Sequence, residues 1–459
     1  MNKDKALFRL EREKLLLTGE IPRLFMKYAL PGVVGLLFLG IQSVIDGIVL
    51  GRFVGANALA SVNLVLPCYS LISAFAIVMG IGGQTLVSIS LGRGDKQEAN
   101  NALRSVFVFL LGMSVVVSLV IFLSAGKIAS FLGANEVLLP DAVHYIRALV
   151  PFFPLLCAMF FGDYIIKAMG HPLYATSVMG MTVVLNIVLD LVFVAVLGWG
   201  VMGWGVMGAG LATGIAFTMG ACFNVPRLFS RHEVVAVQRG RYDRRLVWNA
   251  FYNGSSEGMS ELSVAITVFL FNITMMRYLG ESGVAAFTAI NYILFIGTTV
   301  FLGISDGIIP IIGYNYGARQ QERIKSILKL AARTNSLIGI GLFLLLLLFG
   351  EQVIGLFFKD HGSEAFEIAS RGVSIYCFAF LLCGLNILAS SYFTAIGNAK
   401  ISIIISALRG LVFVGIGILV LPAVFGIDAI WYDVPIAEIC TLSVSFWLVR
   451  RSLFNNRSN

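Results

Sequence analysis

Acidic side chains inside apolar stretches are the residues of this sequence that could carry ion chemistry. Asp46 lies near the end of one apolar stretch and Asp190 near the end of another. Asn186 precedes Asp190 by four residues, so on a helix these two side chains share one face, one turn apart. Thr213 lies early in the next apolar stretch. Two carboxylates, an amide and a hydroxyl at one depth can bind a proton or a small hard cation such as Na⁺.

A second pair of acids, Glu257 and Glu261, is also spaced four residues apart. These two carboxylates could form a second site for an ion or for a charged substrate. Arg409 and Glu438 fall at comparable depths in later apolar stretches. The alternative is therefore that all these charges neutralise one another in a structural ion network, and the sequence leaves both interpretations open.

The composition places these charges in a membrane. Hydrophobic residues make up 58% of the chain and charged residues 13%, and the mean hydropathy is +0.89, which leaves too little polar surface to enclose a water-soluble core. The net charge of +8 resides in short clusters between apolar stretches, so no nucleic-acid partner is expected. The six cysteines show no CxxC or Cys/His spacing, which argues against a metal centre other than a possible Na⁺ site at the first cluster.

Twelve apolar stretches approach the roughly 20 residues that a helix needs to cross a bilayer. The chain is therefore predicted to be an all-α integral membrane protein with twelve transmembrane helices. If the N-terminus is inside, 26 of the 33 Lys and Arg residues fall on inner segments and six on outer ones, which predicts that both termini are cytoplasmic. The predicted spans are 28–50, 62–88, 106–124, 145–166, 174–197, 207–229, 247–276, 286–312, 330–349, 373–394, 401–421 and 430–449.

The two halves of the chain resemble each other. The segment 55–63, GANALASVN, matches 283–291, GVAAFTAIN, and GIGG ending at Gly83 matches GISDG ending at Gly307. Six spans in each half predict two pseudo-symmetric six-helix bundles of the same orientation. The predicted organisation is an amphipathic cytoplasmic segment 1–27, an N-terminal lobe 28–229, a basic cytoplasmic linker 230–246, a C-terminal lobe 247–449 and a cytoplasmic tail 450–459.

Three motifs resemble the multidrug and toxic compound extrusion family: VIDGIVLGR in the first span, LNIVLD in the fifth, and PIIGYNYGAR at the end of the eighth. This resemblance implies an inner-membrane secondary antiporter that exports organic cations and other amphipathic drugs by alternating access, in exchange for H⁺ or Na⁺ and without another cofactor. In that family the cluster of Asp46, Asn186, Asp190 and Thr213 is the cation site. Some branches pair an acid of the seventh helix with one of the tenth, but the span 373–394 contains no acid here.

Other function classes are weaker predictions. A flippase for a lipid-linked saccharide or a peptidoglycan precursor shares the two-lobe architecture, but its anionic cargo favours basic residues in the cleft, and here the acids outnumber Arg409. An integral-membrane enzyme needs a catalytic motif, and none is recognised. We therefore expect a monomeric transporter of small molecules, not an enzyme. Because Thr274 stands at the position that repeats Asp46, ion coupling is expected in the N-terminal lobe.

Overall fold

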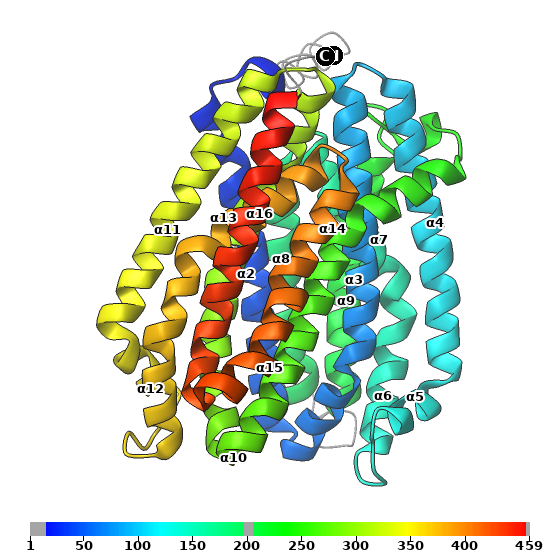
Figure 1. The fold of residues 1–459 in the computed structure, drawn as a ribbon. Coiled ribbons are helices and arrows are strands. Elements are labelled where there is room, and N and C mark those ends of the chain that lie inside the picture. Colours follow the sequence, from blue (N-terminus) through cyan, green and yellow to red (C-terminus); the bar gives the residue numbers. More distant parts are fainter. Residues whose placement is uncertain (1–14, 197–204, 456–459) are drawn as a thin grey trace. The chain divides into compact units, whose positions relative to one another are not determined.

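The structure is a computed structural model that describes residues 15–196 and 205–455. The chain folds into helices in these ranges, without a β-strand (Figure 1). In the first half the helices are α2 (Ile21–Phe53), α3 (Ala56–Gly92), α4 (Lys96–Leu123), α5 (Ala125–Phe131), α6 (Leu139–Leu149), α7 (Phe153–Ala168), α8 (Pro172–Asp190) and α9 (Gly205–Leu228). In the second half they are α10 (Arg244–Gly317), α11 (Gln321–Gly355), α12 (Glu364–Tyr376), α13 (Phe380–Ala395), α14 (Ala399–Ala407), α15 (Phe413–Phe425) and α16 (Asp433–Asn455).

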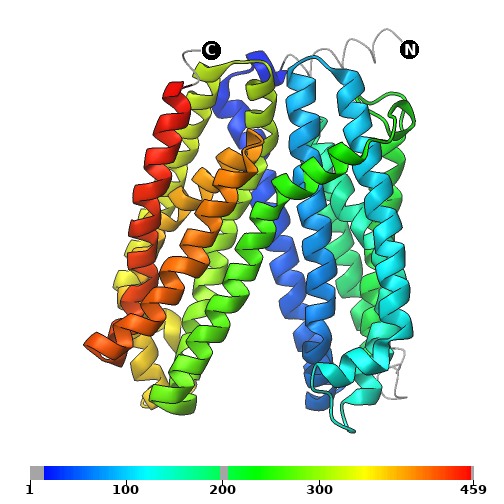
Figure 2. The same ribbon diagram turned by 45° about the vertical axis from the view of Figure 1, so that its right-hand side comes forward.

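The twelve-helix fold predicted from hydropathy is confirmed. In the described ranges, eleven helices are long and apolar enough to cross a membrane, because α10, 74 residues long, contains the two predicted spans 247–276 and 286–312. A straight helix of that length would extend about 110 Å, more than three times the thickness of the hydrocarbon layer. Gly280, with a φ of 60°, interrupts α10, and the chain reverses direction there (Figure 2).

The chain forms two compact units. The first contains Val34–Gly254, and the second contains Gly19–Val33 together with the described chain from Ser255 on. The long helices α2 and α10 are therefore each divided between the two units. The first part of each helix belongs to one unit, and the remainder belongs to the other. Helix α2 begins at Ile21, seven residues before the start of the first predicted span.

Glycines allow close helix contacts inside the first unit. A Cβ atom added to Gly82 of α3 would collide with the backbone of Ala250, at the start of α10. A Cβ atom on Gly254 would collide with the backbone of Val78 in the same way. The start of α10 and the middle of α3 therefore pack backbone against backbone, a contact that small residues allow in membrane proteins.

The second unit repeats this contact with the corresponding residues of the other half. A Cβ atom on Gly307 of α10 would collide with the backbone at Tyr28 of α2, and one on Gly303 with the backbone of Val33. Gly82 and Gly307 are 225 residues apart and lie in the matching GIGG and GISDG segments. The internal sequence similarity thus marks an equivalent helix–helix contact in each unit.

The linker between α9 and α10 is packed against the first unit. Val235 and Ala236 are fully buried. The Asn100 side chain of α4 accepts a hydrogen bond from the Ala236 amide at 2.8 Å, and Arg104 donates to the carbonyl of Gly240 at 3.0 Å. The N-terminal part of α4 therefore anchors the basic linker.

Glu233 is the buried acid of this linker. Its carboxylate accepts a hydrogen bond from Arg227 at 2.8 Å and contacts the ring of His171 at 3.1 Å. Burial alone raises the pKa of Glu233, but the hydrogen bonds to His171 and Arg227 and their charges outweigh it and lower the pKa to about 2. Glu233 therefore fastens the linker to the ends of α8 and α9 as a carboxylate.

We predict that Glu233→Gln lowers the free energy of unfolding at neutral pH by about 2 kcal/mol, the usual size of a hydrogen bond to a charged group. The native pKa lies below the unfolded value of 4.5. The ionised Glu233 carboxylate therefore contributes its full stabilisation above pH 4.5, and this stabilisation is lost as the pH falls toward about 2. Thermal unfolding in detergent between about pH 7 and pH 3 should show a smaller acid destabilisation in Glu233→Gln than in wild type. Glu136→Gln, at an exposed loop acid of the same unit, should follow the wild-type pH profile, and an identical profile in Glu233→Gln would contradict the assignment.

Candidate functional site

A cavity of about 280 Å³ in the first unit contains most of the predicted ion site. Asp46 reaches it from α2, Asp190 from the last turn of α8, and Thr213 from α9. The cavity is lined by Leu39, Gln42, Ser43, Asp46, Gly47, Leu50, Leu59, Val62, Asn63, Leu66, Tyr69, Tyr145, Phe160, Asp190, Ala209 and Thr213. Three helices that are distant in sequence thus bring two carboxyl groups and a hydroxyl group to one cavity.

Asn186 is fully buried and does not line the cavity itself. Its side-chain amide donates a hydrogen bond to Oγ1 of Thr213 at 3.3 Å. Asn186 lies one turn before Asp190 on α8, as the spacing predicted. The structure therefore brings all four residues of the predicted site together, with Asn186 behind Thr213.

Asp46 and Asp190 line the same cavity, close enough for their carboxyl groups to interact electrostatically, and Gln42 lines it as well. Asp190 is only 2% exposed. Two carboxylates can hydrogen bond to each other only when one of them carries a proton, because an ionised carboxylate is only an acceptor. When both are ionised, a cation between them has the same role.

Several buried oxygen atoms at this site lack a hydrogen-bond donor. Within the part of the chain that the structure describes, no donor reaches either side-chain oxygen of Asp190, Oδ1 of Asp46, Oδ1 of Asn186 or Oε1 of Gln42. Buried acceptors are normally paired, and each unpaired one costs roughly 1–3 kcal/mol. Five such atoms in one place form an environment that a proton or a cation with oxygen ligands would satisfy.

A π-helical segment, Leu191–Val196, follows directly on Asp190. Such a segment leaves the regular α-helical hydrogen-bond pattern and is frequent at functional sites. The carboxyl group of Asp190 therefore lies at a discontinuity of its helix.

Five polar residues of the cavity were not selected from the sequence: Gln42, Ser43, Asn63, Tyr69 and Tyr145. Gln42 precedes Asp46 by four residues, so the spacing that linked Asn186 to Asp190 could have indicated it. Tyr69 and Tyr145 also line the cavity, but no sequence signal separates them from the other aromatic residues of apolar helices. Their ring faces and hydroxyl groups make the cavity wall amphipathic.

In the second unit Arg409 forms an ion pair with Glu438. Nε of Arg409 donates to the carboxylate at 2.7 Å, and Glu438 is 3% exposed. The amide of Asn386 donates to the other carboxylate oxygen at 2.7 Å and to the Glu438 carbonyl oxygen at 2.9 Å. Arg409 also donates to Sγ of Cys383 at 3.0 Å. For Arg409 and Glu438, the interpretation as a structural ion pair therefore has direct support.

Glu257 and Glu261 are not part of that ion pair. Among the described residues neither of them forms an ion pair with a Lys or Arg side chain, and Glu261 is exposed on α10. Glu257 is within electrostatic range of Asp306, Glu261 and Arg409. The second ion or substrate-charge site at Glu257 and Glu261 stays a prediction.

Asp433, the first residue of α16, is a buried acid that the sequence reasoning did not select. It is 1% exposed, and its side chain lies against Gly417 of α15, where a Cβ atom would collide with it. Its Oδ2 atom has no hydrogen-bond donor among the described residues. An acid at a helix N-terminus does not stand out in a sequence, because acids are common there for electrostatic reasons.

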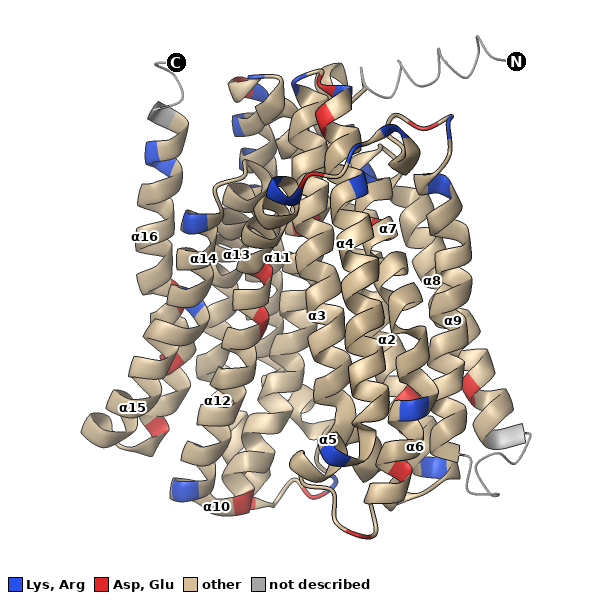
Figure 3. Cartoon of the chain, turned by 90° about the vertical axis from the view of Figure 1, so that its right-hand side faces the viewer, with Lys and Arg blue, Asp and Glu red and all other residues tan. Residues whose placement is uncertain are grey.

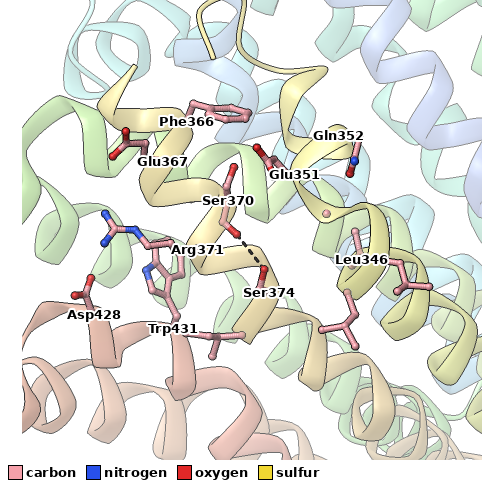
Figure 4. A pocket seen from close by; sticks show the side chains of 14 residues that line it. Leu346, Glu351, Gln352, Phe366, Glu367, Ser370, Arg371, Ser374, Asp428 and Trp431 are labelled. Carbon is pink, nitrogen blue, oxygen red and sulfur yellow. Dashed lines mark hydrogen bonds between the residues drawn. The ribbon is translucent and has the colours of Figure 1, made fainter. Parts of the chain in front are cut away.

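A larger cavity of about 910 Å³ in the second unit lies among α11, α12 and the segment Ile427–Tyr432. Figure 4 shows Arg371 between Glu367 and Asp428, with Glu351 on the opposite side of the cavity. Ser374 donates to the carbonyl oxygen of Ser370 at 3.1 Å. No residue of the predicted site lines this cavity.

Most Lys and Arg residues lie near helix ends and in loops, as Figure 3 shows. Within the described ranges no group of three His, Cys, Asp or Glu side chains could hold a metal ion. A Na⁺ site has a different composition, because amide and hydroxyl oxygens contribute to it.

The chain has relatives among known proteins. The MatE family profile matches residues 31–192 and 258–419, one match in each half. The multidrug export protein MepA of Staphylococcus aureus (strain MSSA476) is 22% identical over 444 residues, which cover 96% of this chain and 95% of that protein. MepA of Staphylococcus saprophyticus matches to the same extent.

Solved structures share the fold. An outward-facing conformation of a multidrug resistance MATE family transporter of the MOP superfamily superimposes with a TM-score of 0.89 at 23% identity, over 97% of this chain and 98% of that one. A MOP superfamily transporter from Pyrococcus furiosus, for which a reverse polarity of the binding pocket suggests a different function, superimposes with a TM-score of 0.88 at 23% identity, over 96% and 98% of the two chains. These similarities show a common architecture.

Proposed function

We propose, from the premise that this chain belongs to the multidrug and toxic compound extrusion family, that it is a secondary antiporter. It exports organic cations and other amphipathic drugs across the inner membrane in exchange for H⁺ or Na⁺. Both termini are cytoplasmic, because the Lys and Arg residues concentrate on that side of the predicted topology. It works as a monomer.

The cluster of buried oxygen atoms without donors at Asp46 and Asp190 is the observation that carries this proposal. A static protein would bury hydrogen-bonded or apolar groups at this depth, because unpaired polar atoms are costly there. A transporter that alternately binds and releases a cation needs such acceptors. Asp46, Asn186, Asp190 and Thr213 form the coupling site in this proposal.

Each of these residues has a distinct part in the coupling step. Asp190 and Asp46 take up one proton or one Na⁺ between them, which removes the repulsion of the two carboxylates. Thr213 supplies a hydroxyl oxygen, and Asn186 orients it through the 3.3 Å hydrogen bond. Loss of the ion restores the repulsion and makes the packing of α2 against α8 and α9 less favourable. The ion therefore shifts the equilibrium toward the conformation that binds it more tightly, by as much as its affinities for the two conformations differ.

The charge of the cavity argues against the flippase alternative. Its described lining contains Asp46 and Asp190 and no Lys or Arg, and an anionic lipid-linked precursor would be repelled there. Aromatic rings such as those of Tyr69 and Tyr145 favour cationic groups instead. A cationic or neutral amphipathic cargo is therefore the better match.

The purified protein in lipid vesicles tests this function directly. A fluorescent lipophilic cation should move against its gradient when a pH gradient or a Na⁺ gradient is imposed, and the gradient that drives it identifies the coupling ion. Empty vesicles and vesicles with collapsed gradients are the controls. Failure of any cationic dye to move with either gradient, together with strong binding of a lipid-linked saccharide, would favour the flippase.

A further inference from the structure

A long apolar groove runs along the second unit between α11 and α16. Helix α13 packs against both of these helices and forms the floor (Figure 1). The groove has a volume of about 790 Å³. Its lining consists of Lys325, Leu328, Lys329, Ala332, Arg333, Ser336, Leu337, Leu385, Leu388, Ala389, Tyr392, Leu442, Ser445, Phe446, Val449 and Leu453.

The charges of this groove are confined to one end of α11. Lys325, Lys329 and Arg333 follow one another at intervals of four residues, so they form a stripe on one face of the helix over about 12 Å. Among the described residues no acid lines the groove. Glu322 pairs with Lys325 at 2.6 Å, whereas Lys329 and Arg333 are exposed and have no acidic partner among the described residues.

The remainder of the groove is mainly apolar and carries no charge, with Ser336, Tyr392 and Ser445 as its polar residues. Beyond Arg333 the wall of α11 continues with Leu337, which is 70% exposed, and the facing wall of α16 includes Phe446. Leu388 of the floor is buried. The groove thus has a positive end and a mainly apolar remainder. An amphipathic molecule with an anionic head group would match both parts.

The positive end lies at the start of α11, which the positive-inside rule places at the cytoplasmic interface. At that level a lipid headgroup meets the basic stripe, while its acyl chains extend along the apolar part. We propose that this groove binds an anionic phospholipid of the cytoplasmic leaflet. Its phosphate contacts Lys329 and Arg333, and one acyl chain lies between Leu337 and Phe446 over the floor of α13.

This ligand is favoured over two simpler ones. A zwitterionic phospholipid fits the apolar part but carries no net charge to balance two unpaired cations. A free phosphate ion balances the charge but gains nothing from the apolar walls. The assignment is independent of which ion drives transport.

Binding can be measured with the full chain in detergent. Phosphatidylglycerol is titrated and the bound lipid is counted by native mass spectrometry, with phosphatidylcholine of identical acyl chains as the comparison lipid. The variant Lys329→Gln/Arg333→Gln should bind phosphatidylglycerol about 30-fold more weakly, since each basic residue near an anionic headgroup contributes about a factor of five. The charge-conserving variant Lys329→Arg/Arg333→Lys should retain most of the affinity.

The matched control is Arg244→Gln/Arg245→Gln, which removes two exposed charges at the start of α10, outside the groove. It should bind phosphatidylglycerol like wild type. An equal loss of phosphatidylglycerol affinity in this control would show that the overall charge of the protein, not the groove, determines binding. That result would overturn the proposal. Equal affinity for phosphatidylcholine, unchanged binding in Lys329→Gln/Arg333→Gln, or displacement of the lipid by glycerol phosphate at equal concentration would also overturn it.

Discussion

Asp46→Asn and Asp190→Asn are each expected to reduce gradient-driven efflux to background while the protein remains folded. Asparagine has nearly the same shape as aspartate but cannot exchange a proton and binds a cation only weakly. Asp190 receives no hydrogen bond from a described residue, so its replacement breaks no such contact. Each substitution also removes the repulsion between the two carboxylates, and stability should stay equal or rise. The measurement is dye efflux from vesicles, together with thermal unfolding of the same preparations.

Controls separate the coupling role from a structural one. Glu136→Gln neutralises an exposed loop acid of the same unit and should transport like wild type. If Asp46 and Asp190 were only structural, the Asn variants would lose thermal stability and expression rather than transport. Undiminished efflux in both stable variants would exclude the proposed coupling site. Thr213→Val should further distinguish the ions, because a hydroxyl ligand matters more to Na⁺ than to a proton shared by two carboxyl groups.

Arg409→Met is expected to destabilise the protein by about 3–5 kcal/mol, the usual cost of leaving one partner of a buried ion pair without compensation. Glu438 is 3% exposed and would keep only the hydrogen bonds from Asn386. The double variant Arg409→Met/Glu438→Gln should recover most of the loss, because no unpaired charge remains in the membrane. Thermal unfolding in detergent measures both effects as a double-mutant cycle.

Arg371→Met is the matched control, since Arg371 is exposed on α12 of the same unit and forms no ion pair among the described residues. Its stability should change little. A small effect of Arg409→Met, or no recovery in the double variant, would contradict the structural role. If the double variant were stable but inactive in efflux, the pair would have a part in transport as well.

The helical fold could be predicted from the sequence, because a chain that crosses a bilayer has few other ways to pair its backbone groups. Backbone groups inside hydrocarbon must be paired within the chain, so each apolar stretch of sufficient length becomes a helix. The spacing of Asn186 and Asp190 on one helix face follows from helical geometry alone. The match between GIGG and GISDG likewise predicted the two-fold repetition, which the glycine contacts of Gly82 and Gly307 explain.

Hydropathy does not determine how each helix is rotated about its axis, and this rotation decides which polar side chains meet. The sequence allowed Arg409 to pair with Glu257, Glu261 or Glu438, and packing brought it to Glu438. Sequence spacing also gave no indication that α2 and α10 are each divided between two units.

The sequence by itself therefore determined the membrane location, the number of helices and several of the acids that need a partner, although not Asp433. Only the tertiary structure decided that Asp46 faces Asp190 in one cavity with Gln42 and two tyrosines, while Asn186 holds Thr213 from behind. The physical reason is that a charge in an apolar stretch is a local property, with a cost set by the bilayer. Its partner is set by contacts between helices that are distant in sequence.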